Sequence, residues 1–129
     1  MANQFVVELK NEPGGLATLA EALAERGIDL RAIGGGGIGN TGHIIMTTAD
    51  DDAARAVLEA GNYTFIEGES ILTEVDDRPG GMARLSRALA DAGVNIYGHL
   101  FLGRWGDRAM FAFVVDRPDV AKPILERKG

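Results

Sequence analysis

The stretch Phe5-Val-Val-Glu-Leu-Lys-Asn-Glu-Pro-Gly-Gly-Leu-Ala-Thr-Leu-Ala-Glu-Ala-Leu-Ala-Glu-Arg-Gly-Ile-Asp-Leu30 occurs twice in this chain. It recurs without a gap as Ile71-Leu-Thr-Glu-Val-Asp-Asp-Arg-Pro-Gly-Gly-Met-Ala-Arg-Leu-Ser-Arg-Ala-Leu-Ala-Asp-Ala-Gly-Val-Asn-Ile96. Ten of the twenty-six aligned positions are identical. A period of sixty-six residues indicates a duplicated domain rather than a solenoid unit. Two copies of one fold can form a site between them that neither copy has alone.

The repeat divides the 129 residues into two domains, 1–68 and 69–129. Domains of about 60 residues have marginal cores when they stand alone, so we expect the two to pack on each other. Hydrophobic residues make up 46% of the chain, which favours a folded protein over a disordered one. Cysteine is absent, and this excludes disulfides and thiolate metal sites.

The net charge of −6 weighs against nucleic acid as a partner, because binding to phosphate depends on basic side chains. The N-terminal residues lack the charged and apolar regions of a signal peptide. No apolar run approaches the length of a membrane span. We therefore expect a cytoplasmic protein without a membrane partner.

The first copy has the sequence pattern of a small α+β domain. Apolar residues alternate in its first segment, a Pro-Gly-Gly turn follows, and a helical apolar stripe ends at Gly27. Three further strands and a second helix, capped by the Asp50–Asp52 run, complete the copy. The expected order is β-α-β-β-α-β, the ferredoxin-like arrangement, with strands near 5–9, 28–33, 43–48 and 63–66.

The second copy follows the same order but ends before its fourth strand. Strands are expected near 71–75, 94–102 and 109–115, and the last helix is expected to begin at Val120, with Pro123 in its first turn. Two arrangements of the missing strand are possible. Strand 71–75 is left as an open edge, or residues 63–67 fold back on it as a hairpin and leave the first copy one strand short. Either arrangement leaves one sheet edge in need of a partner.

The segments Asn11-Glu-Pro-Gly-Gly-Leu16 and Asp77-Arg-Pro-Gly-Gly-Met82 each follow a strand and open a helix. With Gly27-Ile-Asp-Leu30 and Gly93-Val-Asn-Ile96, they resemble the signature of ACT domains. The resemblance covers nearly the whole chain as two tandem copies. It is weakest at the C-terminus, where the last strand is absent.

The resemblance implies a regulatory protein that binds an amino acid and has no catalytic activity and no cofactor. It also implies that the two copies pair through their second strands into one largely antiparallel sheet with helices on one face. The ligand would lie at that seam, against the glycine-containing loop. A homodimer and a partner enzyme of amino-acid metabolism fit the same resemblance.

The resemblance places two ligand sites, each combining residues of both copies. One would join Asn11, Pro13, Gly14, Gly15 and Leu16 to Asn95 and Ile96. The other would join Asp77, Gly80, Gly81 and Met82 to Asp29. An Asn side chain can donate and accept hydrogen bonds, whereas two carboxylates only accept and would repel a ligand carboxylate. Our hypothesis is one competent site, at Asn11 and Asn95, with the Asp77 and Asp29 site empty or selective for a cation.

Simpler roles compete with these. Asn11 and Asp77 can stabilise the turn before the helix through Asx-type hydrogen bonds. The glycine-rich run 34–42 lacks the ending of a phosphate-binding loop, and we expect a mobile connection between strands. A metal site is not expected. The alternative functions are a protein-interaction module that uses the open sheet edge and a small enzyme on the same scaffold.

Overall fold

The computed structural model describes residues 3–126. The chain forms two compact units, Met1–Gly68 and Glu69–Gly129. Each unit is a small antiparallel sheet covered by two helices, so the expected α+β class is confirmed. Among residues 3–126, no helix combines the length and the apolar character needed to cross a membrane.

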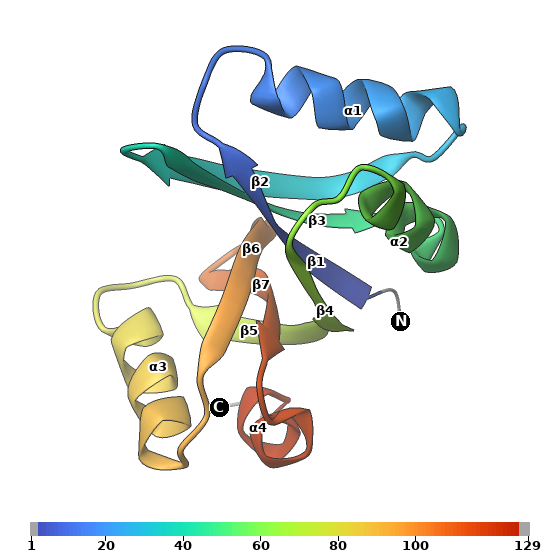
Figure 1. The fold of residues 1–129 in the computed structure, drawn as a ribbon. Coiled ribbons are helices and arrows are strands. Elements are labelled where there is room, and N and C mark those ends of the chain that lie inside the picture. Colours follow the sequence, from blue (N-terminus) through green and yellow to red (C-terminus); the bar gives the residue numbers. More distant parts are fainter. Residues whose placement is uncertain (1–2, 127–129) are drawn as a thin grey trace. The chain divides into compact units, whose positions relative to one another are not determined.

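The first unit contains six elements in the order β-α-β-β-α-β (Figure 1). Its four strands form one sheet in the order β2-β3-β1-β4, in which β1 and β2 each pair antiparallel with β3. The elements are β1 (Asn3–Lys10), α1 (Gly15–Glu25), β2 (Leu30–Ile38), β3 (Thr41–Thr48), α2 (Asp51–Ala60) and β4 (Phe65–Glu69).

One face of this sheet carries the core. Phe5 and Val7 alternate along β1 and are fully buried, because residues two apart on a strand share a face. Leu19 and Leu23, four apart on α1, are buried against them. Figure 1 shows α1 and α2 on this same face of the sheet.

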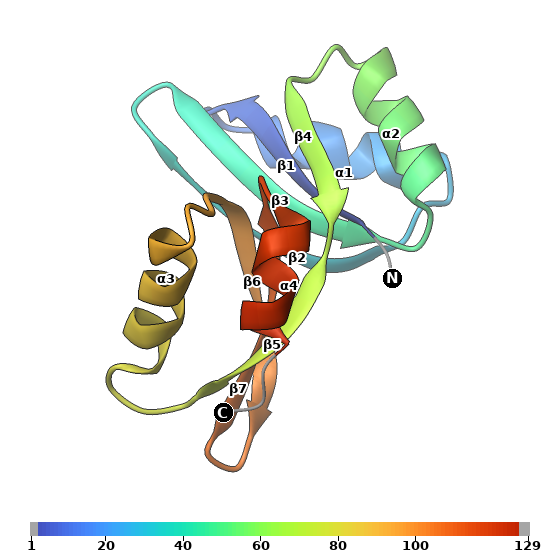
Figure 2. The ribbon, with the colours of Figure 1, turned by 90° about the horizontal axis from the view of Figure 1, so that it is seen from below.

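The second unit repeats the arrangement with one strand fewer. Its elements are β5 (Ile71–Asp76), α3 (Gly81–Asp91), β6 (Ile96–Trp105), β7 (Arg108–Val115) and α4 (Pro118–Leu125). The strands form an antiparallel sheet in the order β5-β7-β6. Helices α3 and α4 contact each other and β5, and Figure 2 shows both beside the sheet. Phe113 and Leu89 are at the centre of this core.

Strand β4 belongs to the first sheet, which decides between the two arrangements considered above. The N–H of Glu8 on β1 donates to the carbonyl of Thr64, just before β4, at 2.9 Å. The hairpin of residues 63–67 on β5 is therefore wrong, and β5 is an edge strand with β7 as its one neighbour in the sheet. The described residues of each unit form one antiparallel sheet. The pairing of the two copies through their second strands stays a prediction.

Two further expectations need correction. Residues Gly34 to Ile38 are not a mobile connection, because they continue β2 and pair with β3. The backbone hydrogen bonds of the hairpin hold glycines extended despite their low strand propensity. The last helix begins at Pro118 rather than at Val120, so Pro123 lies inside it. Proline at the first helical position is favourable because its missing N–H would have no partner there.

Candidate functional site

The loop between β1 and α1 needs both glycines of Pro-Gly-Gly for backbone reasons. Gly14 has a φ of 90°, in the left-handed region that favours glycine. A Cβ on Gly15 would lie 2.9 Å from the carbonyl oxygen of Lys10, closer than real Cβ atoms come. In the second unit Gly80 has a φ of 92°, and a Cβ on Gly81 would overlap the carbonyl oxygen of Asp76. The motif therefore recurs because the strand end and the helix start come very close.

Asn11 connects this loop to the turn between β2 and β3. Its side-chain Nδ2 donates to the carbonyl of Gly39 at 2.9 Å, and its backbone N–H donates to the carbonyl of Asn40 at 3.0 Å. The side chain therefore bonds across 28 positions of the chain instead of forming the local Asx-type bond. No side chain caps α1, and the N–H of Gly15 at its start donates to the carbonyl of Glu12 at 3.2 Å.

A pocket of about 450 Å³, here called the Asn11 pocket, lies where this loop meets β2 and β3. Its walls are mostly apolar or glycine, and Asn11 supplies an amide at its rim. The lining residues are Leu9 to Glu12, Leu16, Ile33 to Gly37 and Gly42 to Ile44. A concave, largely apolar pocket with a few polar groups is typical of a small-molecule site.

Glycines create this hollow. Gly35 lies opposite Ile44 on β3, and Gly37 lies opposite Gly42. Residues two apart on a strand point to the same face, so side chains at 35 and 37 would project toward the pocket. A Cβ on Gly37 would come within 2.6 Å of the Asn11 side chain, whereas a Cβ on Gly36 would meet nothing within 4 Å.

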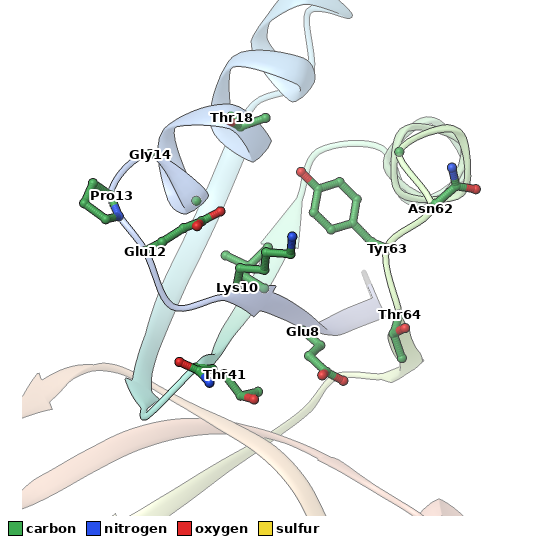
Figure 3. A pocket seen from close by; sticks show the side chains of 14 residues that line it. Glu8, Lys10, Glu12, Pro13, Gly14, Thr18, Thr41, Asn62, Tyr63 and Thr64 are labelled. Carbon is green, nitrogen blue, oxygen red and sulfur yellow. The ribbon is translucent and has the colours of Figure 1, made fainter.

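A second pocket in the same unit, of about 540 Å³, lies on the other side of the loop (Figure 3). Here Lys10 extends its amine between Glu12 and Tyr63, with Thr18 on the neighbouring helix. Pro13, Gly14 and Gly15 line this pocket, whereas Asn11 and Leu16 line the Asn11 pocket. The predicted contacts of the first repeat are thus divided between two hollows. The sequence pattern predicted no site role for Lys10, Thr18 or Tyr63.

The corresponding loop of the second unit is occupied by side chains of its own chain. Arg104 on β6 donates from Nε to Oδ2 of Asp77 at 2.7 Å. Its guanidinium carbon lies 4.7 Å from the ring centroid of Phe101. The hollow beside this pair has about 380 Å³ and is lined by Asp77, Pro79 and Met82 among others.

Arginines also surround Asp76, at the end of β5. Arg108 donates to its Oδ1, and Arg78 and Arg84 lie 3.2 and 3.5 Å from its Oδ2. The equivalent position in the first repeat is Lys10, so the central charge is reversed between the two copies. The two loops share a backbone but present different chemistry.

The remaining predicted contacts lie at the opposite end of each sheet. Asp29 precedes β2 and forms an exposed ion pair with Arg31 at 3.2 Å. Asn95 precedes Ile96 and β6, and its N–H donates to Oδ1 of Asp116 at 2.8 Å. None of Asp29, Asn95 and Ile96 lines the pockets described above within its own unit. The joining of Asn11 to Asn95, and of Asp77 to Asp29, would link the two units and stays a prediction.

Four further residues of the two loops were not predicted as site residues from the sequence: Gly35, Gly37, Phe101 and Arg104. The available signal was residues 100–108, which align with the glycine-rich run 34–42 in the repeat but carry large side chains, Arg104 among them. The contact of Arg104 with Asp77 depends on the register of β6 and on a β-bulge between Phe101 and Gly103. In residues 3–126, no cluster of three or more His, Cys, Asp or Glu side chains could hold a metal ion.

Comparison with known proteins finds a family match in the first unit. Residues 4–60 match the family model of the ACT domain. The fold resembles protein BT0572 from Bacteroides thetaiotaomicron, at 22% identity and a TM-score of 0.71 over 97% of this chain and 86% of that chain. It also resembles the regulatory subunit of aspartate kinase from Thermus flavus, at 20% identity and a TM-score of 0.66 over 98% and 92%. The regulatory subunit of aspartate kinase from Thermus thermophilus is also similar, at 22% identity and a TM-score of 0.60 over 97% of this chain and 89% of that chain. No curated protein matched the sequence.

Proposed function

Because residues 4–60 match the ACT domain model and the second unit repeats the sequence and fold of the first, we propose a regulatory protein that binds an amino acid without catalysis. The binding site is the Asn11 pocket of the first unit. The observation that carries the proposal is an open hollow of about 450 Å³ in which the Asn11 amide lies beside walls that are mostly apolar or glycine.

The groups around the Asn11 pocket suit the two ends of an amino acid. Leu16, in the first turn of α1, lines this pocket, and the positive end of the helix dipole favours a carboxylate there. The Oδ1 atom of Asn11 can accept a hydrogen bond from an ammonium group, while its Nδ2 is held by Gly39. Ile33 and Leu16, both about half exposed, provide an apolar wall for the ligand side chain.

Regulation requires a partner that responds to the bound state. Two of the similar structures are regulatory subunits of aspartate kinase, and we propose an enzyme of amino-acid metabolism as the class of partner. The ligand would act by favouring one arrangement of the protein over another, which requires different affinities for the two arrangements. Asn95 from the second repeat completes the site in this proposal.

A thermal-shift screen of the common amino acids tests the proposal, because a ligand that binds only the folded state stabilises it. We expect one amino acid, or a small group of related ones, to raise the melting temperature. Absence of a shift with every amino acid, confirmed by calorimetry, would contradict ligand binding.

Asn11→Ala should then weaken the identified ligand about 10- to 100-fold, the typical loss of a hydrogen bond to a charged group. Gly37→Ala should also weaken binding, because its Cβ displaces the Asn11 side chain. Gly36→Ala is the matched control, since its Cβ enters open space on the same strand. Equal effects of the two glycine substitutions in titration calorimetry would argue against the Asn11 pocket.

The open edge of β5 favours a second function, a protein-interaction module. An edge strand presents unpaired backbone groups that can bind another strand. This function predicts self-association or partner binding that is independent of any amino acid. The two functions are therefore separable by measuring association with and without the ligand.

A further inference from the structure

The sheet registers show that the second unit carries large side chains where the first unit has its pocket-forming glycines. The strands of the two hairpins can be aligned through their pairing partners. Gly35 opposite Ile44 corresponds to Phe101 opposite Phe111, and Gly37 opposite Gly42 corresponds to Arg104 opposite Ala109. The difference between the two repeats therefore goes beyond the exchange of Asn11 for Asp77.

Phe101 and Asp77 together form a site that holds the guanidinium of Arg104. A carboxylate accepts N–H groups of a guanidinium, and an aromatic face attracts its positive charge. The Arg104 side chain makes both contacts. Its Nε lies 2.7 Å from Oδ2 of Asp77, and its guanidinium carbon lies 4.7 Å from the centroid of the Phe101 ring. Phe101 is held in turn by an edge-on contact with Phe111, with 5.5 Å between ring centroids.

We propose that Arg104 is an internal ligand of the second repeat. Its guanidinium occupies the Asp77 loop at the position where the first repeat is open to an external ligand. The chain consequently has one open amino-acid site, and this number of sites rests on the proposed function. The contact of Arg104 with Asp77 does not depend on that function.

The strength of this internal contact comes from its tether. The Arg104 and Asp77 side chains are 62% and 31% exposed, and an exposed ion pair contributes little by itself. Covalent attachment gives the guanidinium an effective concentration of about millimolar or more. A free cation at lower concentration cannot compete with it, so the wild-type loop should be closed to small cations.

The decisive experiment removes the internal ligand and supplies a free one. Arg104→Ala should bind methylguanidinium chloride, the probe, with a dissociation constant of about 1–10 mM. Backbone amide shifts of Asp77 and Phe101 in ¹⁵N correlation spectra report the binding, with potassium chloride at equal ionic strength as the control. In the wild type the same shifts should need at least about fivefold more probe.

Two further variants make the result specific. Arg104→Ala combined with Asp77→Ala should lose the response, and Arg104→Gln replaces Arg104→Ala if the alanine variant does not fold. Equal probe affinity in the wild type and the Arg104 variant would overturn the proposal, as would a response that survives loss of Asp77.

Titration of wild type with the identified amino acid tests the site count. One site per chain supports the inference, and two equal sites overturn it. If no amino acid binds, the proposed function fails, while the methylguanidinium result still decides whether Arg104 occupies the Asp77 loop.

Discussion

Glu67 on β4 receives three hydrogen bonds and fixes that strand to two other elements. Arg55 of α2 donates Nε to Oε1 and Nη2 to Oε2, both at 2.6 Å, and Asn3 of β1 donates to Oε2 at 2.7 Å. The Arg55 bonds are the main reason that the pKa of Glu67 lies below its ordinary value, against an opposing effect of burial and with a smaller contribution from Asn3. The carboxylate is therefore part of what stabilises the first unit.

Glu67→Gln should lower the free energy of unfolding at pH 7 by about 1–2 kcal/mol, because it removes a charge-assisted acceptor that is 14% exposed. A carboxyl group with a depressed folded pKa stabilises the fold above its unfolded pKa of about 4.3. That contribution is lost as the pH falls through the lower folded value. Urea unfolding should thus show a difference from wild type at pH 7 that shrinks toward pH 3. Glu59→Gln, at an exposed position of α2, is the control.

Individual side-chain contacts were the part of the structure that could least be predicted from the sequence. The Pro-Gly-Gly positions could be located from the sequence because their backbone demands recur in both copies. The partners of Asn11 and Asp77 could not, since Gly39 and Arg104 reach them only after a hairpin closes with a particular register. A contact across 27 or 28 positions is a property of strand pairing, which a local pattern does not encode.

At the scale of elements, the two strand-to-helix connections share a design but differ in how tightly they are packed. Gly81→Ala would force a Cβ into the carbonyl oxygen of Asp76, whereas Gly15→Ala approaches that of Lys10 at 2.9 Å. We expect a loss of about 1 kcal/mol for Gly15→Ala and about 2–3 kcal/mol for Gly81→Ala, typical of overpacking. Thermal unfolding followed by circular dichroism measures both. A larger loss at Gly15 would contradict the packing difference.

The order of elements was predictable, and their lengths were not. Alternation and helical spacing located the strands and helices along the chain. Strand β2 nevertheless extends to Ile38 through four consecutive glycines. Glycine lowers strand propensity, but hydrogen bonding to β3 outweighs that local preference. Helix α4 likewise begins two residues before Val120, because Pro118 suits the first helical position.

At the scale of the whole molecule, charge is divided unequally between the repeats. The first unit holds four Lys and Arg against ten Asp and Glu, and the second holds nine against nine. The sequence therefore carries its whole net charge of −6 in the first unit. Repulsion between two first units disfavours their direct contact. We therefore expect two copies of the chain to associate through the second unit, whose net charge is zero.

Strand β5 is an edge strand of this second unit, and we expect it to be the contact between two copies. Leu72 on β5 is 42% exposed, and Leu102 on β6, at the other edge of the same sheet, is 40% exposed. Lysine on an edge strand opposes strand-to-strand association. Leu72→Lys should therefore weaken a homodimer at least about tenfold in sedimentation equilibrium, which corresponds to about 1.4 kcal/mol. Leu102→Lys should leave it within about twofold of wild type. The reverse result would assign the contact to β6, and a monomeric wild type at all concentrations would exclude self-association through either edge.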